Sequence, residues 1–203
     1  MEIIVSGEHY VELAPEYATA NFSASAQGGS QAVVAAQASG LGNRLADALR
    51  AVASNVVVDP LRISAWTDGT KKRASASVDL RGDFSSAEKL AEFQAVWSVE
   101  DGVQAGWVAW NLTAATMKER EAEVLAGALS NASVRARHIA DAAGAGALVI
   151  LQIADPGLMS EPVTTYDASP KMMRASMAGA PPVDVSPQKL RISARLDVRF
   201  RAE

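Results

Sequence analysis

Hydrophobic and polar positions first alternate with a period of two residues, which is typical of strands with one buried face. This alternation runs imperfectly through Ile3–Leu13 and again through Tyr17–Ala26, with a proline turn at Ala14–Glu16 between them. A three- and four-residue spacing follows, and Ser30 is a candidate N-cap for a helix over Gln31–Ala53. The pattern therefore predicts two strands and then a helix.

The next two β-like stretches are Val56–Thr67 and Lys71–Gly82, on either side of the sequence Asp68-Gly69-Thr70. A short Asp-Gly loop between such stretches is typical of a β-hairpin. Together with the preceding elements, they predict a first ββαββ half.

A second helix is predicted over Ser86–Ser98, with Ser85 or Ser86 at its start. The strand that follows, Val103–Ala114, has apolar side chains on both faces: Val103 and Trp107 on one, and Val108, Trp110 and Leu112 on the other. We expect such a strand to be covered on both sides, by a helix or by another subunit.

The clearest helix is predicted over Thr116–Ala143, with Met117 expected on its buried face and Gly144 at its end. The strongly apolar stretch Ala147–Ile153 and the cleanly alternating stretch Lys189–Arg201 predict two further strands. The fold class that we expect is α+β, with a largely antiparallel sheet packed against three main helices.

The segment Pro156–Pro187 is expected to be a long exposed loop, because it holds six of the eight prolines and four of the six methionines. Flexible thioethers suit adaptable contact surfaces. We expect partner contacts to concentrate there, on the residues Met159, Tyr166, Met172, Met173 and Met177.

Length and composition predict one globular domain over residues 1–203, with 49% hydrophobic and 21% charged residues. A net charge of -4 gives no basic field for a phosphate backbone, so nucleic acid is not an expected partner. The absence of cysteine excludes disulfides, thiolate catalysis and cysteine-based metal sites.

No stretch of the sequence approaches the roughly 20 apolar residues of a transmembrane helix. Met1–Gly7 does not resemble a secretory leader, so we expect a cytoplasmic protein. The alternative is a periplasmic or secreted protein from which a leader was removed.

Candidate chemistry is sparse. His9 and His138 are the only imidazoles, and no short motif places carboxylates beside them, so no catalytic, cofactor-binding or metal-binding residue is assigned and no cofactor is expected. His138 and Asp141 are interpreted as a surface ion pair on one helix face. Gly40-Leu41-Gly42 and Gly144-Ala145-Gly146 lack the strand-glycine-helix order of a dinucleotide site and are interpreted as helix-packing and helix-ending glycines.

The order of these segments resembles the SIMPL family (DUF541) over nearly the whole chain. The resemblance is carried by Val5-Ser6-Gly7-Glu8, in which His9 follows in place of the usual glycine, by Ala143–Gly146 after the long helix, and by the Met/Ala/Pro loop that leads to Val185–Leu190. It implies a βα-rich domain, a tendency to form homo-oligomers, and a loose association with oxidative-stress protection and the cell envelope. It implies no catalytic residues.

The leading hypothesis is a non-enzymatic, self-assembling or partner-binding protein, linked to oxidative-stress protection. A homo-oligomer is also expected because strands such as Lys189–Arg201 offer edges that a soluble protein must pair, charge or cover. The identity of any other protein partner is left open. The alternative is a small cytoplasmic hydrolase or ligand-binding enzyme that uses His9 or His138.

Overall fold

The computed structural model describes residues 1–158 and 188–203, and these residues form two compact units. The first unit comprises Met1–Ala14, residues 112–158 and Lys189–Glu203. The second comprises Pro15–Asn111 and Gln188. Each unit has a hydrophobic core of its own, and the single domain expected over residues 1–203 stays a prediction.

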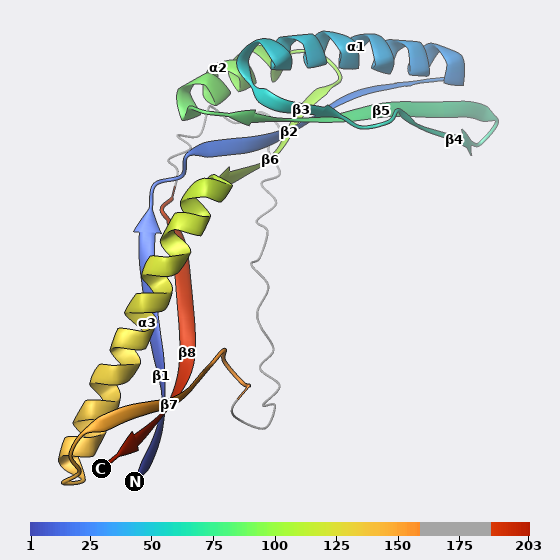
Figure 1. Cartoon of the computed structure of the whole chain (residues 1–203). Coiled ribbons are helices and arrows are strands. Elements are labelled where there is room, and N and C mark those ends of the chain that lie inside the picture. Colours follow the sequence, from blue (N-terminus) through green and yellow to red (C-terminus); the bar gives the residue numbers. More distant parts are fainter. Residues whose placement is uncertain (159–187) are drawn as a thin grey trace. The chain divides into compact units, whose positions relative to one another are not determined.

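The second unit is an antiparallel sheet with two helices on one face (Figure 1). Its strands follow the order β3-β5-β2-β6, and β4 also pairs with β5. Alternate residues of β2 and β5 point to the helices and form the core with Leu45, Leu49 and Phe93. The elements are β2 (Tyr17–Gly28), α1 (Gln31–Val52), β3 (Ser54–Val58), β4 (Arg62–Asp68), β5 (Lys71–Phe84), α2 (Ala87–Trp97) and β6 (Val103–Asn111).

The first unit is a three-stranded antiparallel sheet in the order β1-β8-β7, with one long helix that runs along β1 and β8 (Figure 1). Its core combines Val198 and Phe200 of β8 with Ile3 and Val5 of β1 and with the alanines of the helix. The elements are β1 (Glu2–Leu13), α3 (Ala114–Ala142), β7 (Leu148–Ala154) and β8 (Leu190–Ala202).

The predicted fold class is confirmed: the strands pair antiparallel, and the three helices begin and end within two residues of the expected bounds. The hairpin at Asp68–Thr70 is also confirmed, and Gly69 supplies the left-handed backbone that its turn needs (φ +62°). Gly144 ends α3 in the same conformation (φ +69°), as predicted.

The two serine caps differ. Ser86 accepts a hydrogen bond from the Lys89 amide and so caps α2 with its side chain. Its hydroxyl also donates to Glu88, and mainly for this reason the pKa of that carboxyl lies below its ordinary value. Ser30 occupies the N-cap position of α1, but its side chain makes no capping hydrogen bond; its carbonyl accepts from the Val34 amide instead.

The expected ββαββ half is wrong in its first strand. β1 pairs along its whole length with β8, the last strand of the chain, and belongs to the first unit. The stretch Val56–Thr67 is also two strands, because Asp59-Pro60-Leu61 interrupts it, and both parts pair with β5. The expectation that Lys189–Arg201 offers an edge is also wrong, because β8 lies between β1 and β7 as the central strand of its sheet. Alternation predicted the strands correctly, but it carries no information about which strand lies beside which.

Two expectations about burial are also corrected. Trp107 on β6 is 50% exposed, so this edge strand of the second unit is not covered on both sides within the described residues. Met117 is 50% exposed because the buried stripe of α3 begins only at Val124. The apolar spacing of α3 continues beyond the part of the helix that meets the sheet.

The packing of α3 depends on the absence of a side chain at Gly7 of β1. A Cβ atom there would lie 2.0 Å from the Ala128 carbonyl oxygen and 2.5 Å from the Ala132 amide nitrogen. From residue 128 onward every buried position of α3 is alanine: Ala128, Ala132, Ala136 and Ala140. Helix and strand therefore approach so closely that only glycine fits at position 7.

We predict that Gly7→Ala destabilises the first unit by about 3 kcal/mol or more, because the helix backbone must move away from β1. The matched control is Gly40→Ala on α1, where an added Cβ meets nothing within 4 Å. It should instead stabilise its helix by about 0.5–1 kcal/mol.

Urea unfolding followed by circular dichroism and by tryptophan fluorescence distinguishes a change in the stability of the first unit from one in the second. All four tryptophans lie in the second unit, so fluorescence reports on that unit. Gly7→Ala should lower the midpoint of the circular dichroism transition. An unchanged midpoint would contradict the close approach.

Candidate functional site

Among the residues of the first unit that the structure describes, β7 is an edge strand whose large side chains are exposed although nearly all are apolar. Four of them retain between 39% and 49% of their accessible surface: Val149, Ile150, Leu151 and Ile153. A contiguous apolar patch of this kind marks an interaction surface more often than scattered apolar residues do. We call these four residues the β7 patch.

Pairing with β8 explains why part of the patch is exposed. Ile150 lies opposite Phe200, and Ile153 lies opposite Val198, so each points to the same face as its buried partner. Phe200 and Val198 are 2% and 0% exposed, because α3 covers them, whereas Ile150 and Ile153 are 43% and 47% exposed. The apolar face of the sheet therefore extends beyond the cover that α3 provides.

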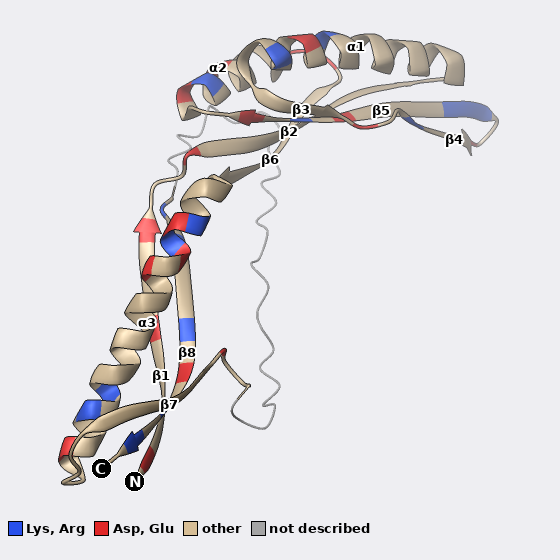
Figure 2. Cartoon of the chain, in the orientation of Figure 1, with Lys and Arg blue, Asp and Glu red and all other residues tan. Residues whose placement is uncertain are grey.

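The two edges of this sheet differ in charge (Figure 2). β1 carries Glu2, Glu8 and Glu12, each directly opposite an arginine of β8. β7 carries no charged residue. Charged side chains are a common protection of edge strands against pairing, and β7 lacks this protection.

A buried carboxylate fixes the chain where it leaves β7. Asp197 of β8 is 8% exposed and is the one charged residue buried among those described. One carboxylate oxygen accepts from the Ser6 hydroxyl (2.5 Å) and the other accepts from the Gly157 amide (3.2 Å). Arg195 also donates to the Ser6 hydroxyl (3.3 Å). This cluster joins β1, β8 and the turn after β7, so it positions the end of the β7 patch.

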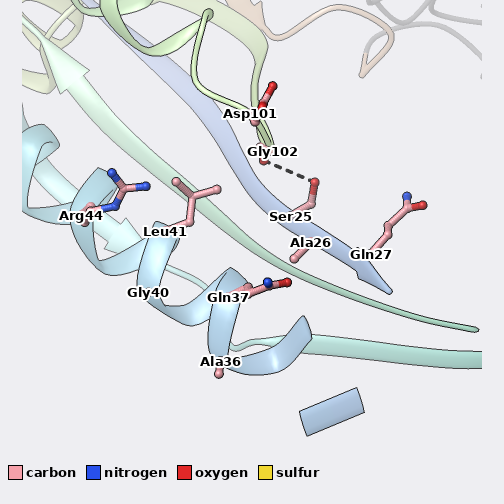
Figure 3. Close-up of a pocket in the computed structure, with 10 residues that line it drawn as sticks. All are labelled: Ser25, Ala26, Gln27, Ala36, Gln37, Gly40, Leu41, Arg44, Asp101 and Gly102. Atoms are coloured by element: carbon pink, nitrogen blue, oxygen red, sulfur yellow. Dashed lines mark hydrogen bonds between the residues drawn. The ribbon is translucent and has the colours of Figure 1, made fainter. Parts of the chain in front are cut away.

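The second unit has an open groove of about 730 Å³ between α1, the end of β2 and the turn before β6 (Figure 3). The turn is fastened to β2, because the Gly102 carbonyl accepts from both the amide (2.7 Å) and the hydroxyl (3.3 Å) of Ser25. Arg44 at the rim is paired with Glu100 (2.7 Å). The lining residues are Ser25, Ala26, Gln27, Ala36, Gln37, Gly40, Leu41, Arg44, Asp101 and Gly102.

The groove contains neither of the two histidines. His9 packs against α3, where a Cβ added at Gly127 would lie 2.3 Å from its ring. His138 lies on α3, and the ion pair expected with Asp141 is not among the ion pairs of residues 1–158 and 188–203. Over the same residues, no group of three or more His, Asp or Glu side chains is placed to hold a metal ion.

The residues of the predicted contact loop lie outside the described residues, so the hypothesis about them stays a prediction: Met159, Tyr166, Met172, Met173 and Met177. The sequence pattern identified β7 as an apolar strand but did not predict that its side chains are exposed. The available signal was the run of apolar residues without a charge, which is equally typical of a central strand.

Among the helices that the structure describes, none is long and apolar enough to cross a membrane.

We predict that the Asp197 cluster stabilises the first unit measurably. Asp197→Asn keeps the size of the side chain but removes the charge and one acceptor, and should cost about 1.5–3 kcal/mol of unfolding free energy. In a double-mutant cycle with Ser6→Ala, the two changes should be non-additive by about 0.5–3 kcal/mol, because the residues share a hydrogen bond. Urea unfolding of the four proteins measures this coupling. Strictly additive changes in the free energy of unfolding would contradict an interaction between Asp197 and Ser6.

The comparisons with known proteins agree with the resemblance noted in the sequence. A search of the curated proteins found no match. The model of the SIMPL family, described as a protein of unknown function (DUF541), matches residues 3–200 of the 203-residue chain. This match spans residues of both units and includes β1, β7 and β8. The chain therefore belongs to the SIMPL (DUF541) family.

Proposed function

We propose that this protein acts by association rather than by catalysis, and that it assembles with further copies of itself or with a protein partner through the β7 patch. The observation that carries the proposal is an uncharged edge strand with four large apolar side chains between 39% and 49% exposed. Such a strand exposes both backbone hydrogen-bonding groups and apolar surface, and an added strand would satisfy both.

The surrounding structure supports a preformed site. α3 is held on β1 and β8 by close packing at Gly7, so it is not free to shift sideways and cover Ile150 and Ile153. The turn after β7 is fixed by the hydrogen bond from the Gly157 amide to Asp197. A strand that binds at β7 therefore meets a rigid edge, and the cost of ordering this side of the interface is small.

The alternative function, a hydrolase or ligand-binding enzyme that uses His9 or His138, draws less support from the geometry. The open groove of the second unit could accommodate a small polar ligand, but its lining includes no imidazole. The link to oxidative-stress protection likewise stays a prediction.

We predict that the purified protein has a solution mass above that of one chain, and that Ile150→Lys lowers it toward the monomer. A lysine at the centre of the strand adds a charge that an apolar interface would have to desolvate. The control is Val134→Lys, because Val134 is a 53% exposed valine on α3 outside the patch. Light scattering at tens of micromolar protein measures the masses.

Circular dichroism of both variants should match the original protein, which shows that the change acts on assembly and not on folding. A monomeric mass for the unchanged protein at this concentration would refute self-assembly. An equal loss of mass in both variants would place the contact elsewhere.

A further inference from the structure

We infer that β7 pairs antiparallel with β7 of a second copy around a two-fold axis, so that the two sheets of the first unit become continuous. This inference rests on the proposed function, and it names both the occupant of the β7 edge and the register of the pair. Three features of the described residues support it: the distribution of charge, the position of the apolar faces, and an irregularity within β7.

Charge favours β7 as the strand that meets its own copy. When a strand pairs with the identical strand of a second copy, any charged residues on it come close to residues of the same charge. β7 has no charged residue, and two copies meet without repulsion. β1, the other edge, would bring its three glutamates against three more. The same contact would therefore be unfavourable at β1.

The apolar faces match when the axis is perpendicular to the sheet. A rotation about such an axis makes the strands antiparallel and keeps the α3 side of both sheets on the same side. Ile150 and Ile153 of one copy then lie beside the same residues of the second copy, between two α3 helices. The part of the apolar face that one α3 leaves exposed is thus shared and covered in the pair.

The irregularity in β7 indicates the register. Ile150 lies opposite Phe200, but Gln152 lies opposite the next residue of β8, Arg199, so Leu151 is an extra residue without a partner of its own. Ile150 and Ile153 consequently point to the same face although three positions separate them.

Every antiparallel register of two identical strands satisfies two-fold symmetry, so the side chains decide between registers. The register that places Ile150 opposite Ile153 of the second copy, and hence Ile153 opposite Ile150, forms two isoleucine pairs on the α3 face. The neighbouring contact joins Val149 to Ala154 of the second copy, and both of these residues point away from α3. Each of these contacts joins apolar residues that point to the same face, and the central contact joins Leu151 to Gln152 of the second copy.

The chain contains no cysteine, so introduced cysteines can test this register without background. Single variants Ile150→Cys and Ile153→Cys are prepared, one of them isotopically labelled, and are mixed, allowed to exchange subunits and oxidised. Directly opposite residues have Cα atoms about 4.5–5.5 Å apart, within the range of about 4.4–6.8 Å that a disulfide spans. We expect the mixed disulfide to form faster and in higher yield than either disulfide between identical variants.

Two controls accompany this measurement. Val134→Cys reports the rate of random collision, because Val134 is an exposed residue of α3 outside the patch. Ile4→Cys, 53% exposed on β1, is mixed with Ile150→Cys to detect a contact between unlike edges. Light scattering of each reduced variant confirms that it assembles like the unchanged protein.

The outcomes separate this inference from the proposed function. A preferred mixed disulfide between positions 150 and 153 supports the paired β7 strands. An oligomeric protein whose β7 variants cross-link no faster than Val134→Cys overturns the inference but leaves self-assembly intact. A preferred disulfide between positions 4 and 150 also overturns it, because pairing of unlike edges leads to rings or filaments rather than a closed pair. A monomeric protein refutes both.

Discussion

The close contact between α3 and β1 is the constraint on which the first unit depends. Gly7 lets the helix backbone rest on the strand, with a hypothetical Cβ only 2.0 Å from the Ala128 carbonyl oxygen. The alanines of α3 keep this approach possible along the helix, and Asn131 adds a hydrogen bond to the Glu8 carbonyl (2.5 Å). Small residues on both sides fix the helix at one position above the sheet. The glycine of the Val5-Ser6-Gly7-Glu8 segment therefore has a structural role.

A helix in this position covers β1 and β8 but leaves the large side chains of β7 exposed. Val198 and Phe200 are buried under α3, while their neighbours on β7 stay nearly half exposed. The position that the Gly7 contact gives α3 thus determines which strand stays uncovered, because the helix packs on β1 and β8. The uncovered strand is also the one of the three without charge, so the packing that fixes the helix on β1 leaves the proposed interaction surface exposed at β7.

The second unit differs from the first in how its sheet is covered. Two helices cover one face of its sheet, and the aromatic cluster of Phe22, Phe84 and Phe93 fills the space beneath them. The opposite face carries a row of hydrogen-bonded polar side chains: Asp83 accepts from Thr19 (2.6 Å) and from Asn55 (2.9 Å), and Thr19 accepts from Asn111 (3.0 Å). This row crosses four neighbouring strands and satisfies their side chains locally. The same face also carries Trp66, which is 46% exposed.

The sequence alone determined the elements, because alternation, helical spacing and turn residues act locally. The three helices, the Asp68–Thr70 hairpin and the apolar strand predicted over Ala147–Ile153 follow from neighbouring residues. It also carried the family resemblance. Tertiary structure decided that β1 pairs with β8, that Met117 is exposed and that β7 is an edge. An apolar strand has the same sequence pattern whether it lies at the centre or at the edge of a sheet. Its exposure depends on which other segments of the chain cover it. For that reason the candidate site emerged only when burial and register were known together.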